Sequence, residues 1–168
     1  MKDKVVLIGM PGCGKTTIGK VLATDLNYNF FDMDDYIEEI AQKSIKELFE
    51  EGEEYFREWE TKACKELVCK KKCIISSGGG VIKKDINIDI LKENCIIVFV
   101  NRPIENIVED VDVASRPLLK DGKEKIYKLF DERYDKYKKA CHIEIKNEGY
   151  LMDTLTEIEK SLKDLLKK

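Results

Sequence analysis

Short runs of apolar residues recur along this chain and alternate with longer stretches whose apolar residues are three or four positions apart. The short runs are typical of strands buried on both faces, and the longer spacing is typical of amphipathic helices. Their alternation predicts an α/β fold in which right-handed crossovers connect a five-stranded parallel sheet flanked by helices. The expected strands are Lys4–Ile8, Asn29–Met33, Cys73–Ser77, Cys95–Val100 and Cys141–Ile145. The expected helices are Gly14–Leu26, Asp34–Gln42, Ser44–Glu50, Glu53–Lys70, Asp85–Glu93, Pro103–Asp110, Lys123–Lys139 and about Met152–Leu166.

One polar stretch, from Glu109 to Lys123, does not fit this alternation. It contains Arg116-Pro117 and shows neither the strand pattern nor the helix pattern. Loops of that length inside a compact domain are usually functional. We therefore expect a mobile lid over about residues 109–122.

Length and composition limit the class of protein. The 168 residues fit a single domain, residues 1–168, and the 43% hydrophobic and 38% charged content is that of a soluble globular protein. A net charge of −3 gives nucleic acid no general attraction. No apolar run approaches the ~18 residues of a membrane span, and the first run is too short for a signal peptide. We expect a cytoplasmic monomer without nucleic-acid or membrane partners.

The stretch GMPGCGKTT, residues 9–17, directly follows the first expected strand. It contains Gly9-x-x-x-x-Gly14-Lys15-Thr16, the pattern of a phosphate-binding loop, between a strand and a helix as the mechanism requires. Glycines let successive backbone N–H groups point at a phosphate, and the helix N-terminus adds its free donors and its dipole. Lys15 is expected to reach the β- and γ-phosphates and Thr16 to ligate Mg²⁺. The loop therefore predicts a nucleoside triphosphate site.

Two carboxylates, Asp32 and Asp34, stand on either side of Met33 at the end of the second expected strand. Alternation would put both on one face at the carboxyl edge of the sheet, where open α/β sheets bind ligands. One could hold a water of the Mg²⁺ shell, and the other could accept a hydrogen bond from an attacking hydroxyl. The alternative is a helix N-cap at Asp34 or Asp35, which would explain only one carboxylate.

Two further motifs add candidate binding groups. Arg57 and Glu60 are three positions apart on an expected helix and can pair, although a solvated surface pair would have the same spacing. Gly78, Gly79 and Gly80 follow the third expected strand, at the same carboxyl edge. Three consecutive glycines would let a ligand lie against bare backbone, and a flexible connector is the alternative.

Together these motifs resemble those of one family, the shikimate kinases, from the first residue to about residue 140. The order and spacing of the motifs carry the resemblance more than any one of them. It implies a three-layer P-loop kinase fold with a mobile lid at about 109–122 and a helical shikimate-binding segment at about 33–60. The motifs are GMPGCGKTT, Asp32-Met33-Asp34, Phe56-Arg57-x-x-Glu60, Gly78-Gly79-Gly80, Arg116-Pro117-Leu118-Leu119 and Arg133 in the next expected helix.

The resemblance implies transfer of the γ-phosphoryl group of ATP to the 3-hydroxyl of shikimate, with Mg²⁺ as cofactor, in aromatic amino acid biosynthesis. The implied catalytic residues are Lys15, Asp34 and Arg116. The implied substrate-binding residues are Asp34, Arg57, Gly78, Gly79, Gly80 and Arg133. The implied nucleotide-binding residues are Gly12, Cys13, Gly14, Lys15, Thr16, Thr17 and Arg116. The implied metal-binding residues are Thr16 and Asp32.

Each implied role has a physical reason. Asp34 would act as the base or orient the attacking oxygen. Arg57 and Arg133 would grip the carboxylate of shikimate, a planar anion suited to guanidinium forks, with Glu60 holding Arg57. Arg116 would arrive with the lid and stabilise the charge on the transferring phosphoryl group. Phe49 and Phe56 would wall the pocket, and Ser76 would lie near the water shell of Mg²⁺.

The resemblance is weakest at the base of the nucleotide. The family often carries an arginine that stacks on adenine seven residues before the lid arginine, and Glu109 stands there in this chain. Either another side chain covers the base, with Arg102 as a candidate, or the base is held loosely. Nucleotide preference is therefore less determined by the sequence than phosphate binding is.

Other functions share the phosphate-binding loop. A GTPase is disfavoured, because Asn101-Arg102-Pro103 stands where a guanine-reading motif would be. The nearest alternative is another small-metabolite kinase, such as a gluconate kinase, or a nucleoside monophosphate kinase. Arg57 and Arg133 flanking Asp34 favour an acceptor with both a carboxylate and vicinal hydroxyls, which a nucleotide would match less well. A non-catalytic ATP-binding regulator would bind ATP but would not release ADP when an acceptor is added.

Overall fold

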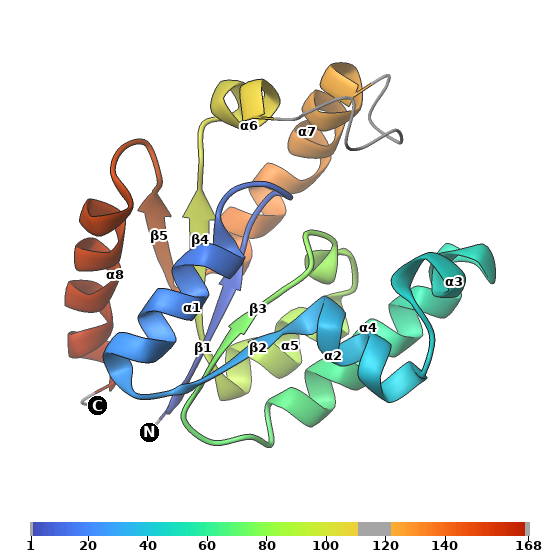
Figure 1. Cartoon of the computed structure of the whole chain (residues 1–168), viewed down its shortest axis with the longest axis horizontal. Helices are drawn as coiled ribbons and strands as arrows, with labels where there is room; N and C mark the ends of the chain where they lie inside the picture. Colours follow the sequence, from blue (N-terminus) through green and yellow to red (C-terminus); the bar gives the residue numbers. More distant parts are fainter. Residues whose placement is uncertain (1, 111–121, 167–168) are drawn as a thin grey trace.

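The structure, a computed structural model, describes residues 2–110 and 122–166. A five-stranded parallel sheet forms the centre of the molecule, with the strands in the order β2-β3-β1-β4-β5 (Figure 1). The predicted fold class, helices flanking such a sheet, is confirmed. The strands are β1 Lys4–Ile8, β2 Asn29–Asp32, β3 Cys73–Ser76, β4 Ile96–Asn101 and β5 Ile143–Lys146.

Helices cover both faces of the sheet. Helices α1 and α8 pack together on one face, while α5 and α7 lie against the other face and α4 packs against α5 (Figure 1). No helix in the described part of the chain is both long and apolar enough to cross a membrane. The helices are α1 Lys15–Leu26, α2 Met33–Ala41, α3 Ile45–Glu50, α4 Glu53–Leu67, the short 3₁₀ helix η1 Val81–Lys83, α5 Asp85–Asn94, α6 Ile104–Asp110, α7 Gly122–Ala140 and α8 Leu151–Leu166.

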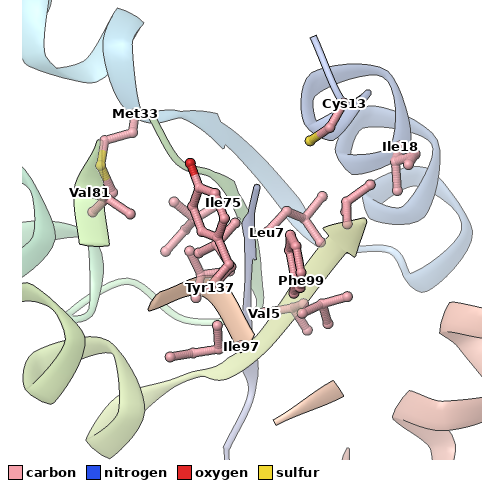
Figure 2. Close-up of a cluster of buried hydrophobic side chains, with 14 of the residues drawn as sticks. Val5, Leu7, Cys13, Ile18, Met33, Ile75, Val81, Ile97, Phe99 and Tyr137 are labelled. Carbon is pink, nitrogen blue, oxygen red and sulfur yellow. The ribbon is translucent and has the colours of Figure 1, made fainter. Parts of the chain in front are cut away.

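The core lies on both faces of the three central strands. Strand β1 is paired on both edges, and its residues from Val5 onward are buried, which is why its sequence is a continuous apolar run. Tyr137 of α7 is fully buried against β4, where its ring stacks on Phe99 with centroids 5.2 Å apart (Figure 2). Each fully buried side chain of this size stabilises the fold by about 1.5–3 kcal/mol.

The strand order places the ligand-binding edge beside β1. From β1 the chain first builds β2 and β3 on one side and then crosses to β4 and β5 on the other side. The connections therefore diverge at the carboxyl end of β1, and such a switch point is where open parallel sheets bind ligands. The glycine-rich loop of residues 9–14 begins at this point (Figure 1).

The second strand is shorter than predicted, because a side chain starts the next helix early. Oδ1 of Asp32 accepts hydrogen bonds from the backbone N–H groups of Asp34 (3.0 Å) and Asp35 (3.3 Å). Asp32 is thus the N-cap of α2, and Met33 is the first helical residue. The expectation of a cap at Asp34 or Asp35 is wrong, as is the expectation that strand alternation places the two carboxylates together.

The last strand begins later than predicted, at Ile143 rather than Cys141, because of the single histidine of the chain. The backbone N–H of His142 donates to the carbonyl of Ile97 at 2.8 Å. Its ring Nδ1 accepts from the N–H of Ile97 at 2.9 Å. The ring thus takes the place that a backbone carbonyl would fill in the sheet.

The expected lid over about residues 109–122 stays a prediction, and two helices include its first and last residues. Glu109 and Asp110 belong to α6, and Gly122 belongs to α7, so residues 109–122 are not one continuous loop. Residues 111–121, which include Arg116, lie outside the described residues.

His142 should make stability depend on pH. Burial lowers its pKa, and the nearby Lys2 and Lys92 lower it further. The unfolded chain, with a pKa of about 6.5, binds the proton first as pH falls, so the free energy of unfolding drops from about pH 7 down through the lowered pKa. His142→Asn keeps an acceptor near the Nδ1 position but removes the titrating ring. We expect its free energy of unfolding to fall less than that of the unaltered protein between about pH 7.5 and pH 5.5.

Urea unfolding followed by circular dichroism at these two pH values measures the difference. Carboxylates that titrate in the same range affect both proteins alike, so the comparison isolates the ring. Equal losses of stability in the two proteins would show that His142 does not contribute.

Candidate active site

The loop between β1 and α1 has the geometry of a phosphate cradle. Gly12 (φ 81°) and Gly14 (φ 102°) adopt left-handed backbone angles that other residues rarely reach. The turn ends at Gly14, the N-cap of α1, so the free N–H groups of that helix face the loop. The thiol of Cys13 is fully buried and lies under the loop (Figure 2), so Cys13 can offer only its backbone to a ligand.

Lys15 crosses the loop from the first turn of α1. Its Nζ donates to the carbonyls of Gly9 (2.8 Å) and Met10 (2.9 Å), and the side chain is only 8% exposed. The ammonium group is therefore held at the centre of the loop by two neutral acceptors. A phosphate group placed there would offer it an acceptor that is also ionised, and a hydrogen bond between two opposite charges is stronger than one to a neutral carbonyl.

Three hydroxyl and carboxylate oxygens meet beside the loop. The Thr16 hydroxyl donates to Oδ2 of Asp32 at 3.1 Å and lies 3.2 Å from the hydroxyl of Ser76. Oxygen donors are what Mg²⁺ prefers, and Mg²⁺ commonly keeps several waters and takes few protein ligands. In the described ranges no group of three or more His, Cys, Asp or Glu residues could hold a metal alone. The cluster fits a cation that phosphates and water also coordinate.

A cavity of about 510 Å³ lies over this loop. Its walls are the loop residues from Pro11 to Thr17 apart from Cys13, the carboxylates of Asp32 and Asp34, and the end of β3 with the first two glycines after it. A second, smaller cavity of about 150 Å³ is lined by Arg57 and Arg133. Asp34, Gly78 and Gly79 line both cavities, so the two spaces meet at these residues.

Asp34 stands at the junction of the cavities. It is in the first turn of α2, where the Asp32 cap fixes the backbone that carries it. Burial of the carboxylate in the cleft raises its pKa, and the charge of the neighbouring Asp32 raises it further, while Lys15 acts in the opposite direction. A carboxylate with a raised pKa is a stronger acceptor for a proton from a substrate hydroxyl.

A buried ion pair and two stacked aromatic rings line the smaller cavity. Nη1 of Arg57 pairs with Oε1 of Glu60 at 2.9 Å, and both side chains are buried, at 7% and 1% exposure. The Arg57 guanidinium lies 5.1 Å from the centre of the Phe56 ring, which stacks on Phe49 at 4.3 Å. Burial raises the pKa of Glu60, and the charge of Arg57 opposes that rise.

Two atoms in this cavity have spare hydrogen-bonding capacity. In the described part of the chain, Nε of Arg57 and Oε2 of Glu60 are buried without a hydrogen-bond partner. Buried polar atoms are nearly always paired, and unpaired ones call for an explanation such as a missing ligand. The pocket is thus lined by groups that a polar ligand could satisfy.

Each of the three consecutive glycines lies close to a side chain from another part of the chain. A Cβ on Gly78 would be 3.2 Å from Oδ1 of Asp34. A Cβ on Gly79 would be 2.8 Å from the Pro11 ring, and one on Gly80 would be 2.5 Å from both terminal nitrogens of Arg57. Glycine at these positions therefore lets Asp34, Pro11 and Arg57 lie close to the backbone of residues 78–80. This close packing is not that of a flexible connector, the alternative considered from the sequence.

Sequence reasoning missed two buried groups that fasten this glycine segment. The Tyr137 hydroxyl donates to the carbonyl of Gly79 at 2.5 Å. Asn87 of α5 donates to the carbonyl of Val81 at 3.1 Å and accepts from the Thr61 hydroxyl at 2.7 Å. Tyr137 could have been found from its position one turn after Arg133, whereas Asn87 gives no local signal.

A third cavity, of about 220 Å³, opens on the other side of the loop. Arg102 and Asn147 line it together with Thr17. Arg102 donates to the carbonyl of Gly12 at 2.9 Å and pairs with Asp110. Asn147 donates to the carbonyl of Cys13 at 2.9 Å and accepts from the Thr154 hydroxyl of α8 at 3.1 Å, so both residues brace the loop itself.

The structure brings together every implied site residue that it describes. Apart from Cys13, which lines the third cavity, the described nucleotide, metal and substrate residues line the two cavities that meet at Asp34. Arg116 alone falls outside the described residues. Glu109 is exposed on the last turn of α6 and does not line the third cavity.

Comparisons with known proteins agree with this geometry. Residues 11–163 match the family model described as shikimate kinase. A shikimate kinase from Clostridium botulinum (strain Alaska E43 / Type E3) is 53% identical over 95% of this chain and 97% of its own length. A shikimate kinase from Clostridium beijerinckii is 52% identical over 99% and 98%. The solved shikimate kinase from Acinetobacter baumannii, in complex with shikimate, has a TM-score of 0.90 and 32% identity, covering 100% of this chain and 97% of that one. The chain belongs to the shikimate kinase family.

Proposed function

We propose that the two cavities that meet at Asp34 are the two halves of one phosphoryl-transfer site. The reaction is that of a shikimate kinase: the γ-phosphoryl group of ATP passes to the 3-hydroxyl of shikimate, which gives shikimate 3-phosphate and ADP. The observation that carries the proposal is that one carboxylate, Asp34, lines both the phosphate cavity and the arginine-lined cavity. At this junction an acceptor hydroxyl could approach both a base and a terminal phosphate.

The larger cavity takes the phosphates. The backbone N–H groups of Gly12 and Gly14 and the first turn of α1, from Lys15 to Thr17, surround them, while the N–H of Cys13 donates to the carbonyl of Met10 and closes the loop. Lys15 exchanges its carbonyl acceptors for phosphate oxygens and neutralises charge that develops there. Phosphoryl transfer needs mainly this positioning and charge stabilisation.

The Thr16–Asp32–Ser76 cluster is the proposed Mg²⁺ site. Thr16 would ligate the ion directly, while Asp32 and Ser76 would hold waters of its shell. When bound, the ion supplies positive charge to the phosphate oxygens and orients them. Asp32 keeps its other oxygen on the N-cap of α2, so the metal site and the position of Asp34 are connected.

The smaller cavity takes the acceptor. Arg57 and Arg133 hold its carboxylate, a planar anion that suits two guanidinium forks, and the glycine segment of residues 78–80 provides a flat wall. The residues from 33 to 60 form the proposed shikimate-binding segment, because α2, α3 and α4 carry Asp34 and Arg57 and pack on one another. Binding the carboxylate at one end directs a ring hydroxyl toward Asp34 at the other.

Two parts of the proposal concern the ends of the nucleotide. Arg116 stabilises charge on the transferring phosphoryl group, a role that rests on the family resemblance alone. Arg102 is the proposed cover for the base, because it lines the third cavity next to the loop while Glu109 does not. A guanidinium over an aromatic face contributes about 0.5–2 kcal/mol.

The cellular setting is also a proposal. All six cysteines are free, as in proteins of the reducing cytoplasm, and ATP is the co-substrate. We therefore propose a cytoplasmic enzyme. We also propose a single-domain monomer, because the three cavities form around one sheet edge of one chain.

Asp34→Asn tests the proposed function. With Mg-ATP, we expect the unaltered protein to release ADP only when shikimate is added, and not with gluconate or nucleoside monophosphates. Asp34→Asn should lower kcat by about 10²–10⁴-fold, the usual contribution of a positioned base. Protonated Asp34 cannot act as a base, and its pKa is raised. As pH falls, the unaltered protein should therefore lose activity at a pH higher than the ordinary aspartate pKa of about 4.

Asp35→Asn is the matched control, since Asp35 lies in the same helical turn, is exposed and lines neither cavity. A coupled assay for ADP measures all three proteins. Equal turnover of Asp34→Asn and Asp35→Asn would contradict the assignment of Asp34. Release of ADP with a different acceptor would contradict the substrate.

Gly80→Ala tests the acceptor cavity. The added Cβ would lie 2.5 Å from Nη1 and Nη2 of Arg57, so the guanidinium must move. We expect the KM for shikimate to rise about tenfold or more, as for the loss of a hydrogen bond to a charged group. The KM for ATP serves as the internal control and should stay within about twofold, because the phosphate cavity does not include Gly80. A rise in both constants would show a general disturbance of the site.

Arg102→Ala tests the base-binding proposal. We expect the dissociation constant for ADP to rise about 2–30-fold, the range of a lost cation–π contact, while the KM for shikimate stays the same. Glu109→Gln, at the position where the family often has arginine, is the control and should leave ADP affinity unchanged. Isothermal titration calorimetry measures both. If Arg102→Ala binds ADP as tightly as Glu109→Gln does, Arg102 does not cover the base.

A further inference from the structure

One buried hydroxyl outside both cavities contacts the wall of the acceptor site. Tyr137 of α7 is 0% exposed, and its ring stacks on Phe99 of β4 at an angle of 25°. Figure 2 shows it within the buried cluster, with its oxygen at the end away from Ile97. That oxygen donates to the carbonyl of Gly79 at 2.5 Å. An otherwise apolar side chain thus places one polar atom on the glycine segment.

The contact fixes the direction of a neighbouring donor. The carbonyl of Gly79 and the N–H of Gly80 belong to one planar peptide unit, and the peptide bonds of the described residues are trans. In a trans peptide the C=O and N–H point in opposite directions. Since Tyr137 holds the carbonyl on the core side, the N–H of Gly80 must point to the opposite side.

The opposite side of that peptide is the acceptor cavity. Gly80 lines it, and the terminal nitrogens of Arg57 lie against the Cα of Gly80. Within residues 2–110 and 122–166, the N–H of Gly80 donates to no protein acceptor, whereas the next N–H, of Val81, donates to the carbonyl of Gly78. The Gly80 N–H is thus a free donor beside a guanidinium, which suits one carboxylate oxygen of a ligand.

Tyr137 is also one helical turn from the second arginine of the cavity. Positions four apart lie on one face of a helix, and Nη1 of Arg133 is 3.3 Å from the place of a Cβ on Gly79. Burial raises the pKa of Tyr137 to about 12, with Arg133 acting in the opposite direction, so the hydroxyl keeps its proton and remains a donor. Tyr137 thus contacts the carbonyl of Gly79, and Arg133, one turn earlier on the same helix face, lies beside the same residue.

We propose that Tyr137 is a positioning residue of the acceptor site, which aims the Gly80 N–H and Arg133 at the same carboxylate. The inference rests on the proposed function, because it names a residue that acts on shikimate through its neighbours. Tyr137 touches no substrate. Its effect is on binding of the acceptor and leaves the nucleotide site alone.

Tyr137→Phe removes the hydroxyl and keeps the stacked ring. The peptide of Gly79 and Gly80 then loses its anchor, and we expect the KM for shikimate to rise about 3–15-fold, the range for the loss of one hydrogen bond. The KM for ATP and kcat should stay within about twofold. Steady-state kinetics with each substrate varied in turn, together with a thermal melt, measures these quantities.

Tyr134→Phe is the matched control. Tyr134 is on the same helix, contacts the same Phe99 ring edge-on at 6.0 Å, and accepts a hydrogen bond from Asn101 rather than donating to the glycine segment. It should leave the KM for shikimate unchanged. A lowered melting temperature of Tyr137→Phe with an unchanged KM would reduce Tyr137 to a core residue and overturn the proposal, as would equal rises in both KM values.

A double-mutant cycle with Arg133→Lys tests the coupling. If Tyr137 acts through this subsite, the double variant should raise the KM for shikimate by less than the product of the two single effects. Multiplicative effects would overturn the proposal. If the unaltered protein does not release ADP in response to shikimate, the proposed function is wrong, and that outcome is distinct from a failure of the Tyr137 proposal.

A measurement on the unaltered protein covers the case in which Tyr137→Phe does not fold. The amide resonance of Gly80 should shift in an ¹⁵N-correlated spectrum when shikimate is added, because its N–H faces the carboxylate. If that resonance stays in place while others of the cavity shift, the N–H does not face the ligand and the proposal is wrong.

Discussion

A single carboxylate, that of Asp32, connects the parts of this molecule that must meet for phosphoryl transfer. One of its oxygens ends β2 and starts α2 by accepting from the N–H groups of Asp34 and Asp35. Its other oxygen accepts from the hydroxyl of Thr16 in the first turn of α1, and that hydroxyl also lies beside Ser76 on β3. The capping interaction thus sets where Asp34 lies relative to the phosphate-binding loop. Charge and geometry at the junction of the two cavities depend on it.

Close approach is the second constraint. The glycine segment after β3 leaves little room for side chains, because a Cβ on Gly79 or Gly80 would overlap Pro11 or Arg57 and one on Gly78 would crowd Asp34. This allows groups from α2, the phosphate-binding loop and α4 to converge on one short stretch of backbone. Such a bare stretch would be free to reorient, and contacts from Tyr137 and Asn87 on two other helices hold it. The absence of side chains lets the neighbouring groups come close, and the two hydrogen bonds keep the backbone in one orientation.

The sequence predicted the strands well, because strands buried on both faces leave continuous apolar runs, and β1 and β3 show this directly. It predicted the phosphate-binding loop from its glycines and Lys15, since the physics of that loop is local. It was wrong where a polar side chain replaced a backbone group: Asp32 shortened β2, and His142 delayed β5. A helix cap, or a side chain that replaces a backbone carbonyl in a sheet, depends on the position of the side-chain atoms in three dimensions. The spacing of apolar residues in the sequence carries no information about that position.

The acceptor site shows a different limit. The spacing of Arg57 and Glu60 fitted a solvated helix pair as well as a buried one, and only the packing of α4 shows that both are buried. The family resemblance, rather than the pattern, led to Arg57 and Arg133 as one pair. Tyr137 was hidden because an aromatic residue on the buried face of a helix reads as core, and most of its atoms are core. The role of its hydroxyl can be inferred only from the structure, in which the hydroxyl donates to the carbonyl of Gly79.

The buried Arg57–Glu60 pair is better explained by binding of the acceptor than by stability of the fold. Desolvation of two charges commonly costs more than their attraction returns, so such a pair is weak evidence for stability. Here Glu60 neutralises Arg57 and fixes its direction, and the nearby Asp34 helps to keep the pKa of Glu60 high. Glu60 and Asp34 balance the charges of Arg57 and Arg133 in the lining of the cavity, so a ligand carboxylate would meet guanidinium donors rather than a net positive charge. An apolar pair of the same volume could make the fold more stable, but it would leave the anion of the substrate without a counter-charge.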